Sequence, residues 1–178
     1  MDKLNKPKIK ITTLASYRWK EFRNLRLEGV ITDPFGFARS KVEEIQRIPK
    51  YWRNSLIKNL KKDNFVWLFA FNGNEVIGMI GAGRDQLKSR KHVGHIGPLF
   101  LKVKERGFGI GEKLMKGALD TLSKSGCLKV RLEVVEKQKP AINLYIKLGF
   151  KTITTLKREI FIKGRYRNML LMEKYLKK

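Results

Sequence analysis

Six consecutive residues, Arg106-Gly107-Phe108-Gly109-Ile110-Gly111, constrain the fold more than any other stretch of the chain. They follow an apolar, strand-like segment at residues 95–101. After them, apolar residues recur every three to four positions as far as Gly126, which is the pattern of one buried helix face. The glycines therefore occupy a tight turn between a strand and a helix.

Such a turn can bind an anion. Glycine adopts positive φ angles and has no Cβ, so several backbone N–H groups can point at one phosphate. The helix dipole adds roughly half a positive charge at the helix N-terminus, and Arg106 adds a full charge. The sequence therefore predicts a pyrophosphate site on the backbone from Gly107 to Glu112.

The exact pattern of this turn separates it from two other phosphate-binding motifs. A dinucleotide fingerprint, G-x-G-x-x-G, would need a glycine where Glu112 stands, and no Walker A string occurs. The pattern present is R-x-x-G-x-G, preceded by the residues from Leu101 to Glu105. It resembles motif A of the GCN5-related N-acetyltransferase (GNAT) family, V-x-P-x-x-[RQ]-x-x-G-x-[GA]. Leu101 stands in place of the Val, and Val103 in place of the Pro.

A second motif follows at the family's spacing. Residues 141–150, Ala-Ile-Asn-Leu-Tyr-Ile-Lys-Leu-Gly-Phe, resemble motif B, A-x-x-L-Y-x-x-x-G-F. The chain is therefore identified, by resemblance, as a member of the GNAT family. The resemblance implies a single domain over residues 1–178 with an α/β (α+β) fold. Its central sheet would be mixed, mostly antiparallel and splayed, with helices on its faces.

Hydrophobic periodicity and turn residues predict the elements of this domain. Strands are expected at residues 8–12, 65–71, 76–83, 95–101, 128–135, 151–156 and 169–175. Helices are expected from about Ser16 to the break at Asp33-Pro34-Phe35-Gly36, at 43–60 with an interruption or a bend near Pro49, after the glycine turn up to Gly126, and from Pro140 to Leu148. The Asn72-Gly73 pair predicts a hairpin.

The resemblance also implies a cosubstrate, acetyl-CoA, and direct acetyl transfer to an amine in a ternary complex. Pantetheine would pair with backbone groups of Leu99, Phe100 and Leu101. The pyrophosphate would bind Arg106 and the backbone amides of the turn, which are those of Gly107, Phe108, Gly109, Ile110, Gly111 and Glu112. Gln138 stands where the family often has an Asn that binds pantetheine, so the amide is kept on a longer arm.

Two residues are candidates for the chemistry. Tyr145, the tyrosine of motif B, would by resemblance face the CoA sulfur and protonate the departing thiolate. Glu133 would deprotonate the amine, in an arrangement similar to that of the bacterial ribosomal-protein alanine N-acetyltransferases. His95 is a rival base with a suitable ordinary pKa. Each has a structural alternative: a core tyrosine, a solvated glutamate, and a histidine that merely lines the sheet.

The composition excludes several classes. A single cysteine, Cys127, rules out an internal disulfide, and with His92 and His95 it is too small a set for a zinc site, so no metal is expected. The longest apolar run, residues 65–71, is too short to span a bilayer, and residues 1–10 lack the apolar stretch of a signal peptide. A cytoplasmic protein without membrane contact is expected, and a homodimer is left open.

The formal net charge of +24 is the unusual feature of the composition. It would attract polyanions, so a non-catalytic domain that binds RNA or a ribosome is an alternative function. A lysine-rich proteome is the favoured explanation of the charge. The acceptor also stays open between a small amine and a protein N-terminus. The charge should repel a free polyamine unless the cleft is locally acidic. Core packing competes with pocket lining for the early aromatic residues Trp19, Phe35, Phe37, Tyr51 and Trp52.

Overall fold

The computed structural model describes residues 9–37, 41–58, 60 and 62–176, so Lys8 of the first expected strand lies outside the described residues. Seven strands form one sheet in the order β1-β2-β3-β4-β5-β7-β6. They are β1 (Lys10–Thr12), β2 (Phe65–Asn72), β3 (Glu75–Arg84), β4 (Val93–Leu101), β5 (Lys129–Val135), β6 (Lys151–Ile162) and β7 (Arg165–Tyr175). Only β4 and β5 pair in parallel; the other neighbouring strands are antiparallel. The expected mixed, mostly antiparallel sheet is confirmed.

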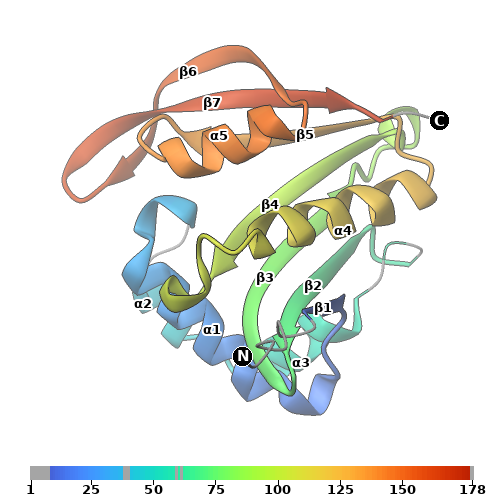
Figure 1. The fold of residues 1–178 in the computed structure, drawn as a ribbon, viewed down its shortest axis with the longest axis vertical. Coiled ribbons are helices and arrows are strands. Elements are labelled where there is room, and N and C mark those ends of the chain that lie inside the picture. The colour runs from blue at the N-terminus through green and yellow to red at the C-terminus, as the bar shows by residue number, and fades with distance from the viewer. Residues whose placement is uncertain (1–8, 38–40, 59, 61, 177–178) are drawn as a thin grey trace, which may run out of the picture.

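Five helices in the described part of the chain cover the two faces of this sheet (Figure 1). They are α1 (Trp19–Thr32), α2 (Lys41–Ile45), α3 (Pro49–Ile57), α4 (Ile110–Lys124) and α5 (Lys139–Lys147). Short 3₁₀ turns precede α1 at Ser16–Arg18 and follow it at Pro34–Gly36 (η2), and others lie at Lys88–Arg90 and Val103–Glu105. The helical stretch expected at 43–60 is interrupted rather than bent, because Pro49 begins a new helix.

Strand β2 shows why an unbroken apolar run can form one strand. Leu68 and Ala70 pack with the apolar face of α4, whereas Phe69 and Phe71 pack with α1 and α3. Both faces of the strand are therefore buried, so the sequence does not alternate between apolar and polar residues. Two apolar layers result, one on each face of the sheet.

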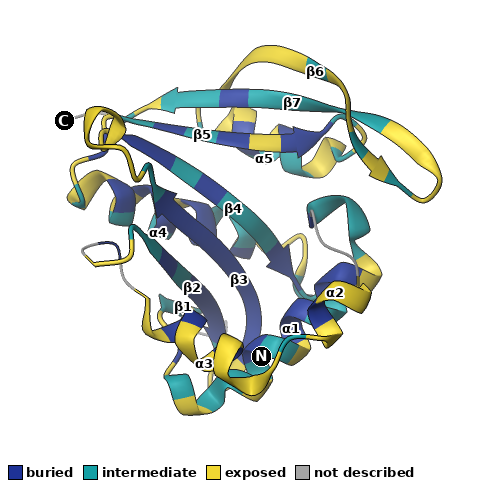
Figure 2. Cartoon of the chain, turned by 180° about the vertical axis from the view of Figure 1, so that it is seen from behind, coloured by how far each residue is buried: buried dark blue, intermediate teal, exposed yellow. Residues whose placement is uncertain are grey.

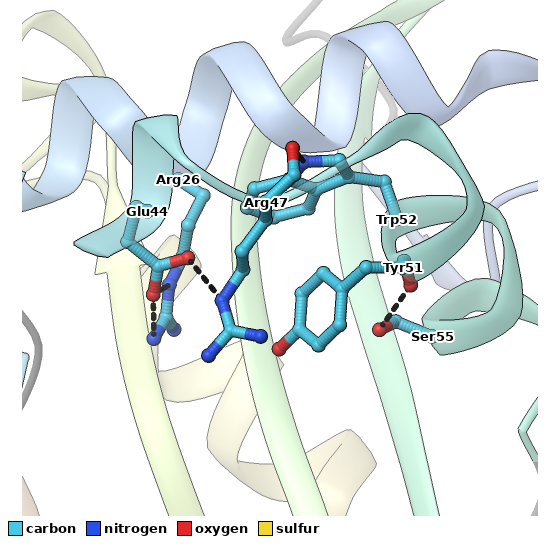
Figure 3. Close-up of polar contacts among 6 residues, drawn as sticks. All are labelled: Arg26, Glu44, Arg47, Tyr51, Trp52 and Ser55. Atoms are coloured by element: carbon cyan, nitrogen blue, oxygen red, sulfur yellow. Dashed lines mark hydrogen bonds and ion pairs between the residues drawn. The ribbon is translucent and has the colours of Figure 1, made fainter. Parts of the chain in front are cut away.

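A buried ion-pair network holds the α1–α3 layer together (Figure 3). The Glu44 side chain on α2 is 1% exposed. Its Oε1 accepts hydrogen bonds from Nε and Nη2 of Arg26 at 3.0 and 2.9 Å, and its Oε2 lies 3.4 Å from Nε of Arg47. The Arg47 guanidinium in turn lies 3.8 Å from the centre of the Tyr51 ring. Contacts of this kind fix the short helix α2 against α1.

The terminal hairpin is longer than its sequence predicts. Strands β6 and β7 run to Ile162 and from Arg165, respectively, although only residues 151–156 and 169–175 were expected in strands. Most of β6 is exposed, as its yellow colour in Figure 2 shows, so no apolar alternation marks its far half. The extension matters because it places side chains of this hairpin beside the cleft that forms where β4 and β5 separate.

None of the helices in the described part of the chain combines the length and the apolar character that crossing a membrane requires.

Candidate active site

The site begins where two neighbouring strands separate. Strands β4 and β5 pair only at Val93, Gly94 and His95 and then diverge, as Figure 1 shows. At the point of divergence β4 contains a β-bulge, because two residues, Gly97 and Pro98, lie opposite the single residue Gly81. Bulges bend a strand and interrupt its ladder. Beyond the bulge, β4 remains paired with β3 but has no described strand on its other edge.

The divergence opens a cleft of about 720 Å³. It is bounded by the α1–η2 segment, β4, β5, the start of α5 and the β6–β7 hairpin. Its lining residues are Asp33, Phe35, Gly36, Phe37, Arg90, His95, Ile96, Gly97, Pro98, Leu99, Arg131, Leu132, Glu133, Val134, Gln138, Ala141, Tyr145, Glu159, Ile160, Met169 and Leu171. Of the residues proposed from the sequence, Leu99, Glu133, Gln138, Tyr145 and the rival base His95 therefore meet in one cavity.

Phe100 and Leu101 do not line the cleft with their side chains. Phe100 is 1% exposed and packs in the apolar layer of α1 and α3, while Leu101 is 8% exposed and packs in the layer of α4. These two residues can offer a ligand only their backbone groups, as the expected strand-like pairing requires. Ile110 likewise is buried in the α4 layer, so it too can contribute only its amide to the turn.

The glycine-rich turn has the expected backbone geometry. Gly107 and Gly109 have φ angles of 87° and 75°, which disfavour any residue with a Cβ, and no described atom lies within 4 Å of where that Cβ would be. Within the described chain, the amides from Gly107 to Glu112 donate to no backbone carbonyl, and the next amide, that of Lys113, bonds Gly109. A row of unpaired N–H groups at the N-terminus of a 15-residue helix suits a phosphate.

Arg106 links this turn to the cleft. Its Nε donates a hydrogen bond to the Leu101 carbonyl at 3.1 Å, and its guanidinium lies 5.8 Å from the centre of the Phe100 ring. Its Nη2 is 3.9 Å from Oδ2 of Asp33, a residue of the cleft wall. The cation is thus held beside the end of β4, where an incoming phosphate could replace the carboxylate.

The same turn is tied to α5, the helix that carries Tyr145. Glu112 lies in the first turn of α4 and forms ion pairs with Lys147 of α5 at 2.6 Å and with Lys116 at 2.8 Å. Hydrogen bonds from the two ammonium groups lower the pKa of Glu112 to about 2. Leu144 of α5 also approaches Gly111. These contacts between α4 and α5 therefore hold the predicted phosphate turn close to the helix that carries the predicted proton donor.

Tyr145 is buried, with 7% of its surface exposed, although it reaches the cleft wall. Burial, and then the negative charge of Asp33, raise the pKa of its hydroxyl to about 12. The phenol therefore keeps its proton at neutral pH. A neutral, partly desolvated hydroxyl can donate a proton to a thiolate that forms next to it.

The two candidate bases share one face of the sheet. His95 lies opposite Arg131 in the β4–β5 register, and Glu133 follows Arg131 by two positions, so all three residues point to the same side. The Glu133 residue is exposed and has no described ion-pair partner. The His95 side chain is 44% exposed, and its Nε2 lies 3.7 Å from Oδ2 of Asp85. Both candidate bases line the cleft.

Asp33 is a functional candidate that the sequence did not single out. Its Oδ1 accepts a hydrogen bond from Nε2 of Gln138 at 3.0 Å, so the amide expected to bind pantetheine is engaged by this carboxylate. The stretch from Asp33 to Gly36 signalled only the end of a helix. The aromatic residues of this region divide as well: Phe35 lines the cleft, Trp52 is buried in the α1–α3 layer, and Phe37 is buried in that layer and also borders the cleft. Neither Trp19 nor Tyr51 lines the cleft.

Comparison with known proteins assigns the family. The model of the Acetyltransferase (GNAT) family matches residues 19–150, which is most of the chain. The chain belongs to the GNAT family. Acetyl-CoA is the cosubstrate of this family. A solved GNAT acetyltransferase from Streptococcus pneumoniae superimposes with a TM-score of 0.81 at 21% identity, and covers 96% of this chain and 100% of its own.

Curated relatives of this GNAT protein are similar over shorter stretches. N-alpha-acetyltransferase 30 of Saccharomyces cerevisiae is 34% identical over 77 residues, which are 43% of this chain and 44% of the yeast protein. Thialysine N-epsilon-acetyltransferase of Sus scrofa is 36% identical over 56 residues, 32% of this chain and 33% of its own length. The chain thus spans less than half the length of either relative. These similarities do not support the alternative of a non-catalytic RNA- or ribosome-binding domain.

Proposed function

We propose that this GNAT protein transfers an acetyl group from acetyl-CoA to a primary amine by direct attack in a ternary complex. One observation carries the proposal: a single cleft contains the unpaired edge of β4, the protonated Tyr145 hydroxyl and the exposed Glu133 carboxylate. Bound acetyl-CoA would supply an activated acetyl group. The residues of the chain supply its binding, the removal of one proton and the delivery of another.

The backbone fits a strand-like arm and a diphosphate. Groups on the free edge of β4, at residues 99–101, would pair with pantetheine, and the unpaired amides of residues 107–112 would bind the pyrophosphate. The Arg106 guanidinium would leave Asp33 and pair with a phosphate. The Gln138 side chain would leave the Asp33 carboxylate and form a hydrogen bond with an amide of pantetheine. Main-chain donors at a helix N-terminus bind phosphate without any special side chain.

The acceptor amine must be neutral before it attacks. For a lysine-like amine with a pKa near 10.4, deprotonation at pH 7 costs about 4–5 kcal/mol, whereas for an N-terminal amine near pKa 8 it costs only about 1–1.5 kcal/mol. Glu133 would accept that proton, directly or through one water molecule. Tyr145 would donate its proton to the sulfur as the carbon–sulfur bond breaks.

His95 is the competing base, because it lies on the same face and is oriented by Asp85. The pH dependence of kcat/KM distinguishes the two. If Glu133 is the base, the fall of kcat/KM at low pH disappears in Glu133→Gln and is retained in His95→Ala. The reverse result would assign the role to His95.

The acceptor class can be identified by a panel of amines screened for CoA release, with N-terminal peptides, lysine derivatives and linear polyamines included. We expect at least one class to release CoA at a rate that depends on both substrates. If no amine releases CoA while acetyl-CoA is bound, the proposed activity is wrong.

A further inference from the structure

The cleft differs in charge from the chain as a whole. Three carboxylates and two arginines lie in its wall: Asp33, Glu133, Glu159, Arg90 and Arg131. A wall that carries one excess negative charge is unexpected in a protein with a formal net charge of +24.

Both arginines pair with acids outside the cleft, and the acid that pairs with Arg131 is shared with Lys129. Arg90 pairs with Asp85 at 3.0 Å, and Arg131 pairs with Glu173 at 2.9 Å. Neither cation therefore offsets the carboxylates of the wall in full. The nearby Arg167 does not line the cleft, and its guanidinium lies 6.0 Å from the centre of the Phe35 ring.

The three carboxylates differ in how far they are already engaged. Asp33 accepts a hydrogen bond from Gln138 and lies 3.9 Å from Arg106. Glu133 is the proposed base. Glu159 forms no ion pair or hydrogen bond through its side chain with any described residue. Glu159 is therefore the carboxylate of the cleft wall that is available to pair with a cation of the substrate.

Glu159 reaches the cleft because β6 is irregular. The β6–β7 register shifts between Leu156 and Ile160, so the intervening residues leave the ladder. Arg158 has a φ of 52°, which is unusual for a residue with a side chain. The bulge re-aims the residues that it contains, and Glu159 is one of them.

Hydrogen bonds fix this bulge to the end of β5. The Arg158 N–H donates to Oδ1 of Asn168 at 3.0 Å, and Nδ2 of Asn168 donates to Oε2 of Glu136 at 3.1 Å. The Glu136 N–H also donates to the Asn168 carbonyl at 3.2 Å. The bulge therefore lies level with Glu136, three residues beyond Glu133. With a rise of roughly 3.3 Å per strand residue, that separation is about 10 Å along the strand.

We propose that Glu159 selects acceptors that carry a second positive charge roughly 10–14 Å from the reacting nitrogen, because the bulge lies about 10 Å along the strand from Glu133 and two strand spacings, again about 10 Å, across the sheet. The inference rests on the proposed acetyl transfer and names its acceptor class. The reacting amine lies at Glu133, and the second cation lies at the bulge. A linear polyamine and a peptide with a basic residue near its N-terminus share this chemistry.

The test compares kcat/KM for matched acceptors. One pair is an N-terminal alanine tripeptide with lysine or norleucine as its third residue; the other is spermidine and octylamine. In wild type, we expect the cationic member of at least one pair to be preferred. Glu159→Gln should lower that preference about fivefold, the size of an exposed ion pair, and added salt should lower it in the same direction. The pair whose preference falls in Glu159→Gln shows whether the acceptor is a peptide or a polyamine.

Asp120→Asn is the matched control, since it removes one negative charge on α4, where Asp120 pairs with Lys124 outside the cleft. It should keep the wild-type preference. A preference that is unchanged in Glu159→Gln, or that falls equally in Asp120→Asn, overturns the inference and leaves acetyl transfer intact. If wild type acetylates neither member of either pair, the inference is wrong, and the broader amine panel then decides whether acetyl transfer stands.

Discussion

Gln138 and Asp33 are joined by a hydrogen bond of 3.0 Å although 105 positions separate them in the chain. This bond connects the end of α1 to the start of α5 across the cleft. It also occupies the amide that, by family resemblance, is expected to bind pantetheine.

Asp33→Ala should strengthen acetyl-CoA binding. The substitution frees both Gln138 and Arg106 from a partner that the cofactor would otherwise have to displace. A gain of about threefold to tenfold in affinity corresponds to one modest polar interaction. Isothermal titration of acetyl-CoA measures it, with Asp120→Ala as the control. Weaker binding by Asp33→Ala would show instead that Asp33 holds the cleft in its binding shape.

Tyr145→Phe should lower kcat by about a hundredfold or more, because general-acid groups contribute on that scale. The affinity for acetyl-CoA should change little, since the ring and its packing on Phe150 are retained. Rapid-quench and titration measurements separate the two effects. A variant with the wild-type turnover number would make Tyr145 a structural residue only.

Glu112 should make the stability of the protein depend on acid pH. Its pKa is about 2 in the folded protein, below the ordinary value of 4.5. A depressed folded pKa stabilises the fold above the unfolded pKa, and that contribution is lost as the pH falls from 4.5 toward 2. Urea unfolding of wild type and Glu112→Gln should therefore differ at pH 6 and converge near pH 2. A constant difference across this range would contradict the assignment.

Glu44→Ala should destabilise the fold by about 3–5 kcal/mol, because it leaves the buried Arg26 cation and the half-buried Arg47 cation without their shared carboxylate. Glu44→Gln should cost less, since an amide oxygen can still accept one hydrogen bond. Urea denaturation gives both values. A loss below about 1 kcal/mol for Glu44→Ala would mean that the network contributes little to stability.

The motifs predicted the parts of the site that depend on local geometry. The positive φ angles of Gly107 and Gly109, the helix that follows them and the place of Tyr145 on α5 all follow from short, spaced patterns. The hairpin of β2 and β3 was also predictable, because two buried strands flank an Asn-Gly turn.

The missed features depend on long-range contacts or on exposed residues. Nothing in the sequence around Asp33 indicates that it meets Gln138 and Arg106, since those contacts exist only after the sheet has formed. Glu159 was missed because an exposed edge strand has no buried face and so lacks the alternation by which strands are predicted.

The most direct test of the proposed cofactor site is a calorimetric titration of acetyl-CoA into wild type, Gly109→Val and Gly73→Val. Both glycines have positive φ angles, 75° and 57°, with no described atom within 4 Å of an added Cβ, but only Gly109 lies in the turn that follows β4. We predict one binding site in wild type, at least tenfold weaker binding in Gly109→Val, and wild-type affinity in Gly73→Val. Equal affinities in all three proteins, or no binding by wild type, would contradict a pyrophosphate site at this turn.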